Sequence, residues 1–465
     1  MDMQYLAYRV NGDGTEDMLD PDLPLSGVRV TREKNGIGRL TASLPPEYEM
    51  ERSDGIKVIR EWSTAIYVQI DGLAFDGFLV VETESDNETL ELDCVGWIGY
   101  GADQPWPDRS NSFNKGNVKV SEVIDRIWDE VQRYSTSNIG LDTDLGIDWP
   151  RIGNPIYEEL PNPKPPGRIE AQDPGKQPKA PSYGKDKGKY QLGRADYDEA
   201  LARWRKRKDA YDKAKREYED RKRKYEQDKK DRAKAIDDAK IKMNYWSTHD
   251  LLRFFQQLAD EVGFSYRVDH QRYGSNFIHT LRCRMGMLGR RHRSYSLIEG
   301  ENVMTAPKIT RGGDEKVTSA VILGAGEGSK MRWLQKTSTH GTGDGLRRAK
   351  VFADKTLTRD NQLMARAQQV LAEYGDPVDI EEFDVIDHGL SPVTAIDVGD
   401  EIRLMTNDRR GRDEDTWVSI EAISLEPEKQ RFTLAVREIT EYTILDRPGT
   451  SGRPITKIPP VLDLH

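Results

Sequence analysis

The stretch VRVTREKNGIGRLTASL, residues 28–44, decides the fold class of this chain. Val28 and Val30 alternate with polar residues before its Asn-Gly dipeptide, and Leu40, Ala42 and Leu44 alternate after it. A period of two is typical of a strand with one buried face, and Asn-Gly accepts the positive φ angles of a tight hairpin turn. The stretch therefore predicts an antiparallel β-hairpin.

The same pattern extends over the first hundred residues. Ile66, Val68 and Ile70 alternate up to a second hairpin dipeptide, Asp-Gly at 71–72, and Leu90 and Leu92 share one face of a later strand. Strands at this spacing are typical of a sandwich or a barrel. We expect residues 1–110 to form a tube-like antiparallel β-barrel.

The last third of the chain is β-rich again. Residues 401–405, 417–425 and 431–436 have strand patterns, and a helix with an apolar face is expected at 358–374. We expect 305–445 to form a second tube-like barrel flanked by that helix. The Pro- and Gly-rich residues 446–465 are expected to be an extended C-terminal arm.

Two amphipathic helices are expected between these regions. One runs over about 120–134, and the other over about 250–262, with Ser247 or Thr248 as its N-cap and Gly263 at its end. We assign residues 111–153 and 244–304 to a mixed, peripheral α/β domain. The expected fold class is thus α+β and β-rich.

An insertion interrupts this pattern. Residues 154–194 are rich in proline and too poor in apolar residues to build a core, so they are expected to be an extended linker. Residues 195–243 are expected to form one long, highly charged helix. An aromatic residue recurs at every seventh position of that helix, and we call this set the aromatic stripe: Tyr197, Trp204, Tyr211, Tyr218 and Tyr225.

A seven-residue spacing returns to nearly the same helix face, so the aromatic stripe is a candidate interaction surface. It has three interpretations: the seam of a homomeric coiled coil, packing against the body of its own chain, or cover for a partner. Tyr is a weak seam residue because its hydroxyl needs water or a partner. The other core position of each heptad is mostly Lys, as at Lys208 and Lys215. Packing along another surface of an assembly is therefore favoured over a homomeric coil.

Composition limits the function. The chain has 465 residues, a net charge of −10 and 36% hydrophobic residues. Duplex nucleic acid is bound through clustered Lys and Arg, so specific nucleic-acid recognition is not expected. No window approaches the ~18 apolar residues of a membrane span, and the start of the chain has no secretory-signal pattern. Cys94 and Cys283 lie in strand-like runs and are expected to be reduced, packed thiols.

No catalytic residue, cofactor-binding residue or metal ligand is identified. The seven histidines lack metal-ligand spacing, and no nucleophile elbow is present. The Gly-rich residues 324–328 follow a strand, but a strand-like run comes next, so a hairpin loop is favoured over a phosphate-binding loop.

The order of several motifs resembles a known family. DCVGWIGY at 93–100 is followed by VSEVIDRIWDEV at 120–131 and DLLRFFQQLADEVGF at 250–264. Then come IEGENV at 298–303, AVILGAG at 320–326 and VGD at 398–400. This order resembles the baseplate-hub or tail-tip hub proteins of long-tailed bacteriophages, in the minor tail protein branch of siphophages that infect actinobacteria.

The resemblance implies a structural virion protein at the tail tip, synthesised in the host cytoplasm. It implies a homotrimer in which each subunit gives two tube-like barrels, so that three copies adapt a sixfold tail tube to a threefold tip and form part of the DNA ejection channel. The implied partners are the tail tube, the distal tail protein and the tip or fibre proteins. The insertion at 154–242 departs from the family pattern. Two alternatives remain open, a tail-associated cell-wall hydrolase and a host-surface-binding tail protein.

Overall fold

The computed structural model describes most of the chain outside its C-terminal end. The described residues are 3–49, 55, 57–86, 88–107, 112–153, 162–182, 187–238, 240–304, 307–311, 316–326, 328, 331–338, 346–353, 357, 360–374, 378–386, 393–407, 413–429 and 431–439. The expected arm at 446–465 lies outside them. The chain divides into two units, residues 1–153 with 241–465, called the body, and residues 154–240, called the inserted unit.

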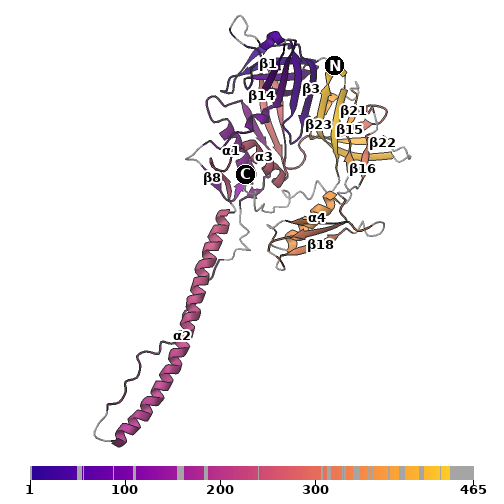
Figure 1. Cartoon of the computed structure of the whole chain (residues 1–465). Coiled ribbons are helices and arrows are strands. Elements are labelled where there is room, and N and C mark those ends of the chain that lie inside the picture. The colour runs from indigo at the N-terminus through magenta and orange to yellow at the C-terminus, as the bar shows by residue number, and fades with distance from the viewer. Residues whose placement is uncertain are drawn as a thin grey trace. The chain divides into compact units, whose positions relative to one another are not determined.

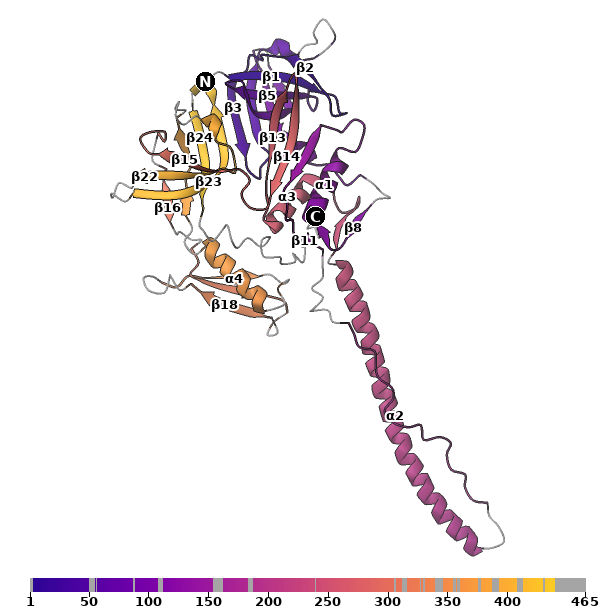
Figure 2. The same ribbon diagram turned by 180° about the vertical axis from the view of Figure 1, so that it is seen from behind.

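A 12-stranded sheet dominates the body (Figures 1 and 2). Its N-terminal lobe contains β1 (Met3–Val10), β2 (Glu16–Asp20), β3 (Ser26–Glu33), β4 (Arg39–Leu44), β5 (Thr64–Ile70), β6 (Leu73–Ser85) and β7 (Leu90–Gly96). Its C-terminal lobe contains β15 (Arg291–Ile298), β21 (Phe383–Val385), β22 (Glu401–Asn407), β23 (Asp413–Glu426) and β24 (Arg431–Glu438). The fold is therefore β-rich α+β, as the sequence predicts.

The two lobes are continuous through one strand pair. β23 pairs antiparallel with β3, with Leu425 opposite Val30, so the order is β15-β22-β23-β3-β4-β7-β6-β5-β1-β2. The prediction of two separate barrels is corrected here: the described strands of both lobes belong to one sheet, whose main path runs from β2 to β15 without closing, while β24 and β21 branch from β23. The pairing joins segments almost 400 positions apart, and no local pattern in the sequence indicates it.

Both predicted β-hairpins are confirmed, but only the Asp-Gly dipeptide forms a tight turn. β5 pairs with β6 around Asp71 and Gly72, with φ of 52° and 79°, whereas β3 and β4 are joined by residues 34–38, in which Asn35 (φ 59°) and Gly38 (φ 72°) have positive φ. Positive φ at both central residues is the geometry that Asp-Gly favours. These turns fix the register that points the alternating apolar residues to one side.

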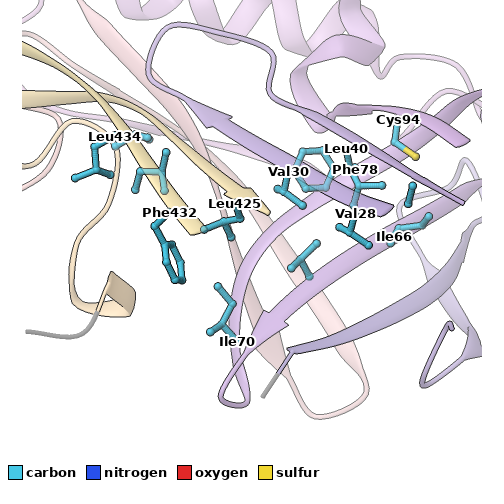
Figure 3. Close-up of a cluster of buried hydrophobic side chains, with 14 of the residues drawn as sticks. Val28, Val30, Leu40, Ile66, Ile70, Phe78, Cys94, Leu425, Phe432 and Leu434 are labelled. Carbon is cyan, nitrogen blue, oxygen red and sulfur yellow. The ribbon is translucent and has the colours of Figure 1, made fainter. Parts of the chain in front are cut away.

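One hydrophobic core spans both lobes. It combines Val30, Leu40 and Phe78 with Leu425 and Leu434, all at most 1% exposed. Figure 3 shows these side chains on strands of both lobes. Cys94 lies in this core as a buried free thiol, and Cys283 is a buried free thiol elsewhere, as predicted. Because both lobes share one core, we expect them to unfold together.

A second core lies between the N-terminal lobe and the peripheral elements. It receives residues from α1 (Val120–Val131), α3 (Leu251–Val262), β13 (Ser265–Tyr273), β14 (Asn276–Arg284) and β10 (Leu141–Leu145). Smaller pairs border it: β8 (Phe113–Lys115) with β12 (Ile241–Met243), and β9 (Val118–Lys119) with β11 (Arg151–Ile152). The α3 N-cap is Asp250, whose side chain accepts from the Arg253 amide, so the prediction of Ser247 or Thr248 is wrong.

A third, small core forms around α4 (Asp360–Tyr374), which packs on β17 (Ser319–Leu323) and β18 (Trp333–Thr337) beside β19 (Ala349–Ala353). β17 and β18 pair antiparallel across the Gly-rich residues, so the predicted hairpin is confirmed. β16 (Ile309–Arg311) pairs with β20 (Val378–Ile380). Short 3-10 helices cover Pro46–Glu49, Trp97–Gly101, Val393–Ala395 and Pro427–Lys429.

The inserted unit contains α2 (Lys187–Asp238), a helix of 52 residues. The predicted long helix is confirmed, and it begins eight residues earlier than the predicted 195. The first turn contains Gly188, a poor helix former, which is why the sequence pattern gives no clear start there. In both views, the first part of the extended segment 162–182 runs beside α2, and its later part forms an open loop that stands away from the helix (Figures 1 and 2).

Candidate functional site: a buried polar junction and the aromatic stripe

A buried arginine joins three parts of the body. Arg32 on β3 donates from Nε to Asp397 Oδ1 at 2.8 Å and from Nη2 to Asp269 Oδ1 at 3.2 Å. Its Nη1 donates to the Phe75 carbonyl at 2.6 Å and lies 3.4 Å from Asp76 Oδ1. The Arg32 side chain is 6% exposed. One guanidinium thus holds the N-terminal lobe, the β13–β14 hairpin and the turn before β22 together.

The charges in this cluster support one another. Burial alone would lower the pKa of Arg32, but Asp397, Asp76 and Asp269 raise it above its ordinary value. Burial alone would raise the pKa of Asp269, but Arg267, Arg32 and Arg282 lower it. Arg32 and Asp269 therefore both remain ionised at neutral pH, and removal of one leaves a buried charge without its partner.

A histidine pair lies on the other side of Asp76. His270 on β13 and His279 on β14 face each other with their Nδ1 atoms 2.9 Å apart. Tyr67 on β5 lies with its hydroxyl 3.3 Å from His279 Nε2 and hydrogen-bonds to Glu16. His270 Nε2 is 3.3 Å from Asp76 Oδ1, although not aligned for a hydrogen bond. The row connects two carboxylates through a tyrosine and two imidazoles.

The short Nδ1 contact requires one imidazole to donate and the other to accept. Both rings therefore cannot be charged at once without losing that hydrogen bond. Burial lowers the pKa of His279, and burial followed by the Glu16 charge raises the pKa of Tyr67. Tyr67 and His279 are thus both neutral at pH 7. Neutral, hydrogen-bonded groups suit a structural contact between β5 and the β13–β14 hairpin.

The described residues offer little that resembles a catalytic or metal centre. No group of three or more His, Cys, Asp or Glu among them is arranged to hold a metal ion. A surface hollow of about 640 Å³ is lined by Arg9, Lys57, Arg60 and Glu61, among others. The Thr83 hydroxyl lowers the pKa of Glu61, which is opposite to what a glycosidase general acid requires.

The five residues of the aromatic stripe occupy equivalent positions on α2. Each one is half-buried, while most residues between them are exposed: Tyr197, Trp204, Tyr211, Tyr218 and Tyr225. Trp204 donates from Nε1 to the Gly175 carbonyl at 3.1 Å, and Lys208 Nζ lies 5.0 Å from the Trp204 ring centroid. The Trp204 bond links the stripe to residues 162–182, which we call the strap.

The sequence identified the stripe but not the polar junction. One signal was available, because Arg32 follows Val28 and Val30 at the same period and so lies on the buried face of β3. A charged residue at an apolar-face position indicates a buried partner. Its partners at 76, 269 and 397 come from distant segments, so the sequence alone could not name them.

No protein-family model matches this chain, and no curated protein matches it. The solved structures to which its structure is similar include three tail proteins. The 43 kDa tail protein of prophage MuSo2 from Shewanella oneidensis has 11% sequence identity and a TM-score of 0.49, and the match covers 97% of this chain and 99% of that one. The tail protein from Neisseria meningitidis MC58 has 10% identity and a TM-score of 0.49, with 97% of this chain and 99% of that one covered. Prophage tail protein gp18 from Listeria monocytogenes EGD-e has 10% identity and a TM-score of 0.46, with 96% of this chain and 98% of that one covered. Within the described residues, no helix is both long and apolar enough to cross a membrane.

Proposed function

We propose that this chain is a structural subunit of a phage tail, of the baseplate-hub or tail-tip hub class, and not an enzyme. What carries the proposal is the pairing of β3 with β23, which places two sheet lobes side by side in one polypeptide. The order of motifs from 93–100 to 398–400 supports the same class and the branch of phages of actinobacteria.

The geometry suggests how such a subunit acts. Three copies with two sheet lobes each would present six lobes around one axis, which suits an adaptor between a sixfold tail tube and a threefold tip. The main path of the described sheet ends at β2 and β15, and an unpaired strand edge favours another strand. A ring closed by symmetry would satisfy both edges with one repeated interface.

The charge of the chain suits a channel for DNA. A net charge of −10 makes an acidic or neutral lumen the expected inner surface, because like charges repel phosphate and prevent adhesion. In this proposal the subunit contacts the tail tube, the distal tail protein and the tip or fibre proteins at the virion tail tip. DNA passes through without sequence recognition.

Mass photometry and class-averaged electron images of the purified chain and of tails that contain it test the proposal. We expect particles of three times the 53.0 kDa chain mass and threefold rings. A ring of another symmetry, or a chain that lies off the tail axis, would exclude the adaptor role. A zymogram on host cell wall tests the hydrolase alternative, and a cleared zone would replace the structural role with an enzymatic one.

A further inference from the structure

The strap has a burial pattern of its own. Its half-buried positions recur at intervals of about three residues, and most are prolines: Pro163, Pro166, Ile169, Ala171, Pro174, Pro178 and Pro181. Three residues per turn is the period of a polyproline II helix, which has no internal hydrogen bonds and exposes its backbone carbonyls. One side of the strap is therefore partly shielded from solvent at recurring positions between 163 and 181.

The repeats of the strap and the stripe have similar lengths. Seven residues of α-helix rise by about 10.5 Å, while three residues of polyproline II rise by about 9.3 Å. The two repeat lengths are therefore similar. Between its contacts with Arg221 and Trp204, however, the strap advances five residues while the helix advances 17, so the pairing does not follow the two pitches position by position.

Three contacts fix the direction of the pairing. Glu170 lies 3.9 Å from Arg221, Gly175 accepts from Trp204, and Pro181 lies against Gly193, with 3.7 Å between the Pro181 Cβ and the site of a Cβ on Gly193. Strap numbers rise as helix numbers fall, so the two run antiparallel. These contacts span 28 helix positions, or about 42 Å of α2.

From these observations we infer that the strap is the resident partner of the aromatic stripe. In the inserted unit, the polyproline strap packs on the α-helix of the same chain. The stripe can contact a second copy of the chain only when the strap is displaced. Tyr suits this role because its ring can pack on proline while its hydroxyl stays in contact with solvent at the edge of the pairing. Proline suits it because little conformational entropy is lost when a preformed segment docks.

The other heptad position agrees with this inference. Lys208, Lys215, Lys222 and Lys229 are all exposed. A two-stranded coil would have to bury them along its seam, whereas a single strap covers only the aromatic row. The inference does not depend on the proposed hub role, because it concerns only contacts within the inserted unit. It is tested by hydrogen exchange of backbone amides in that unit.

Hydrogen exchange of the full-length chain, followed by mass spectrometry of peptides within 197–225, tests the inference. Pro174→Ser with Pro178→Ser removes two half-buried rings, and Pro165→Ser is the matched control because Pro165 is exposed next to half-buried Pro166. We expect hydrogen exchange to be roughly tenfold faster in the double variant than in the wild type, and unchanged in the Pro165→Ser control. The mass of the double variant should also rise with concentration beyond that of the wild type.

Trp204→Phe gives a second readout that keeps an aromatic ring and removes only the bond to Gly175. We expect roughly threefold faster exchange near residue 204 and unchanged oligomeric mass. Equal exchange in the double variant and the Pro165→Ser control would overturn the inference. A lower oligomeric mass of Trp204→Phe would also overturn it, since the stripe would then be a seam between copies.

Discussion

The body and the inserted unit are built by opposite means. In the body, the hydroxyls of Thr31 and Ser424 lie 3.3 Å apart although they are 393 positions apart in the chain. In the inserted unit, the bond from Trp204 to Gly175 spans only 29 positions. The body buries residues such as Val30 and Leu425 completely, whereas every member of the stripe stays half-buried.

This difference determines how each region responds to change. A closely packed core transmits the loss of one group to all its neighbours, so the body should unfold as one cooperative unit. A linear pairing has only neighbours above and below, so damage to the inserted unit should stay local. The predictions below test this contrast, beginning with the largest effect.

Replacement of Arg32 by Met should be the most damaging change in the body. It leaves Asp397, Asp76 and Asp269 without their shared cation, and loss of one partner from a buried ion cluster costs about 3–5 kcal/mol. Chemical denaturation of the full chain measures the free energy of unfolding. Both lobes should lose stability in the same transition, because Arg32 contacts both.

Arg29→Met is the matched control on the same strand. The Arg29 side chain is 63% exposed and its ion pair with Glu426 is 3.5 Å long, so the expected change is within about 1 kcal/mol. Similar losses for the two variants would mean that the junction is not a structural joint. Two separate transitions for Arg32→Met would mean that the lobes are independent.

Sequence reasoning was accurate for most local features of the body. The alternation around 28–44, the tight turn at Asp71 and Gly72 and the amphipathic helix α1 all depend on neighbouring residues, and all were found. The N-cap of α3 is the exception, because Asp250 caps the helix in place of the predicted Ser247 or Thr248. The pairing of β3 with β23 and the Arg32 cluster depend on which distant segments meet. A single sequence shows which residues need partners but does not show which partners they have.

The inserted unit gives the complementary lesson. The stripe was visible as a seven-residue period, and the proline content of the preceding segment was also visible. The three-residue burial pattern of the strap was missed because its prolines do not recur at a strict interval. Its register needs contacts such as Glu170 with Arg221, which only the structure supplies.

A smaller effect is expected from the histidine pair as the pH falls. Burial lowers the pKa of His279 below its ordinary 6.5, so below about pH 6.5 the unfolded chain takes up a proton that the folded chain does not. Stability is therefore complete above that pH and decreases as the pH falls towards the folded pKa. The contribution of one such group is at most about 1.4 kcal/mol per pH unit.

His279→Asn isolates this contribution, because an Asn amide can replace Nδ1 opposite His270 but does not titrate. Denaturation at about pH 7.5 and 5.5 should show a smaller loss of stability for the variant than for the wild type. The carboxyl groups that face the pair, Glu16, Asp76 and Asp142, are present in both proteins. An equal loss in both would assign the pH dependence to groups other than this pair.

Removal of the inserted unit should have the smallest effect on the body. The chain leaves and re-enters the body at one place, since a Cβ on Gly153 would lie 3.4 Å from Ile241 Cγ1, and β11 and β12 anchor the two ends. Replacement of 154–240 by a short Gly-Ser linker should change the free energy of unfolding of the body by no more than about 0.5 kcal/mol. It should also leave the number of chains per particle unchanged.

A deletion extended through β12 is the control for that experiment. It removes Ile241 and Met243, which are 5% and 0% exposed in the second core, and should cost several kcal/mol, about 2–5 for each large apolar side chain. If the shorter deletion is equally damaging, the body depends on the inserted unit for its stability. If it instead changes the number of chains per particle, the stripe contributes to assembly and the contrast between a cooperative body and a self-contained insertion fails.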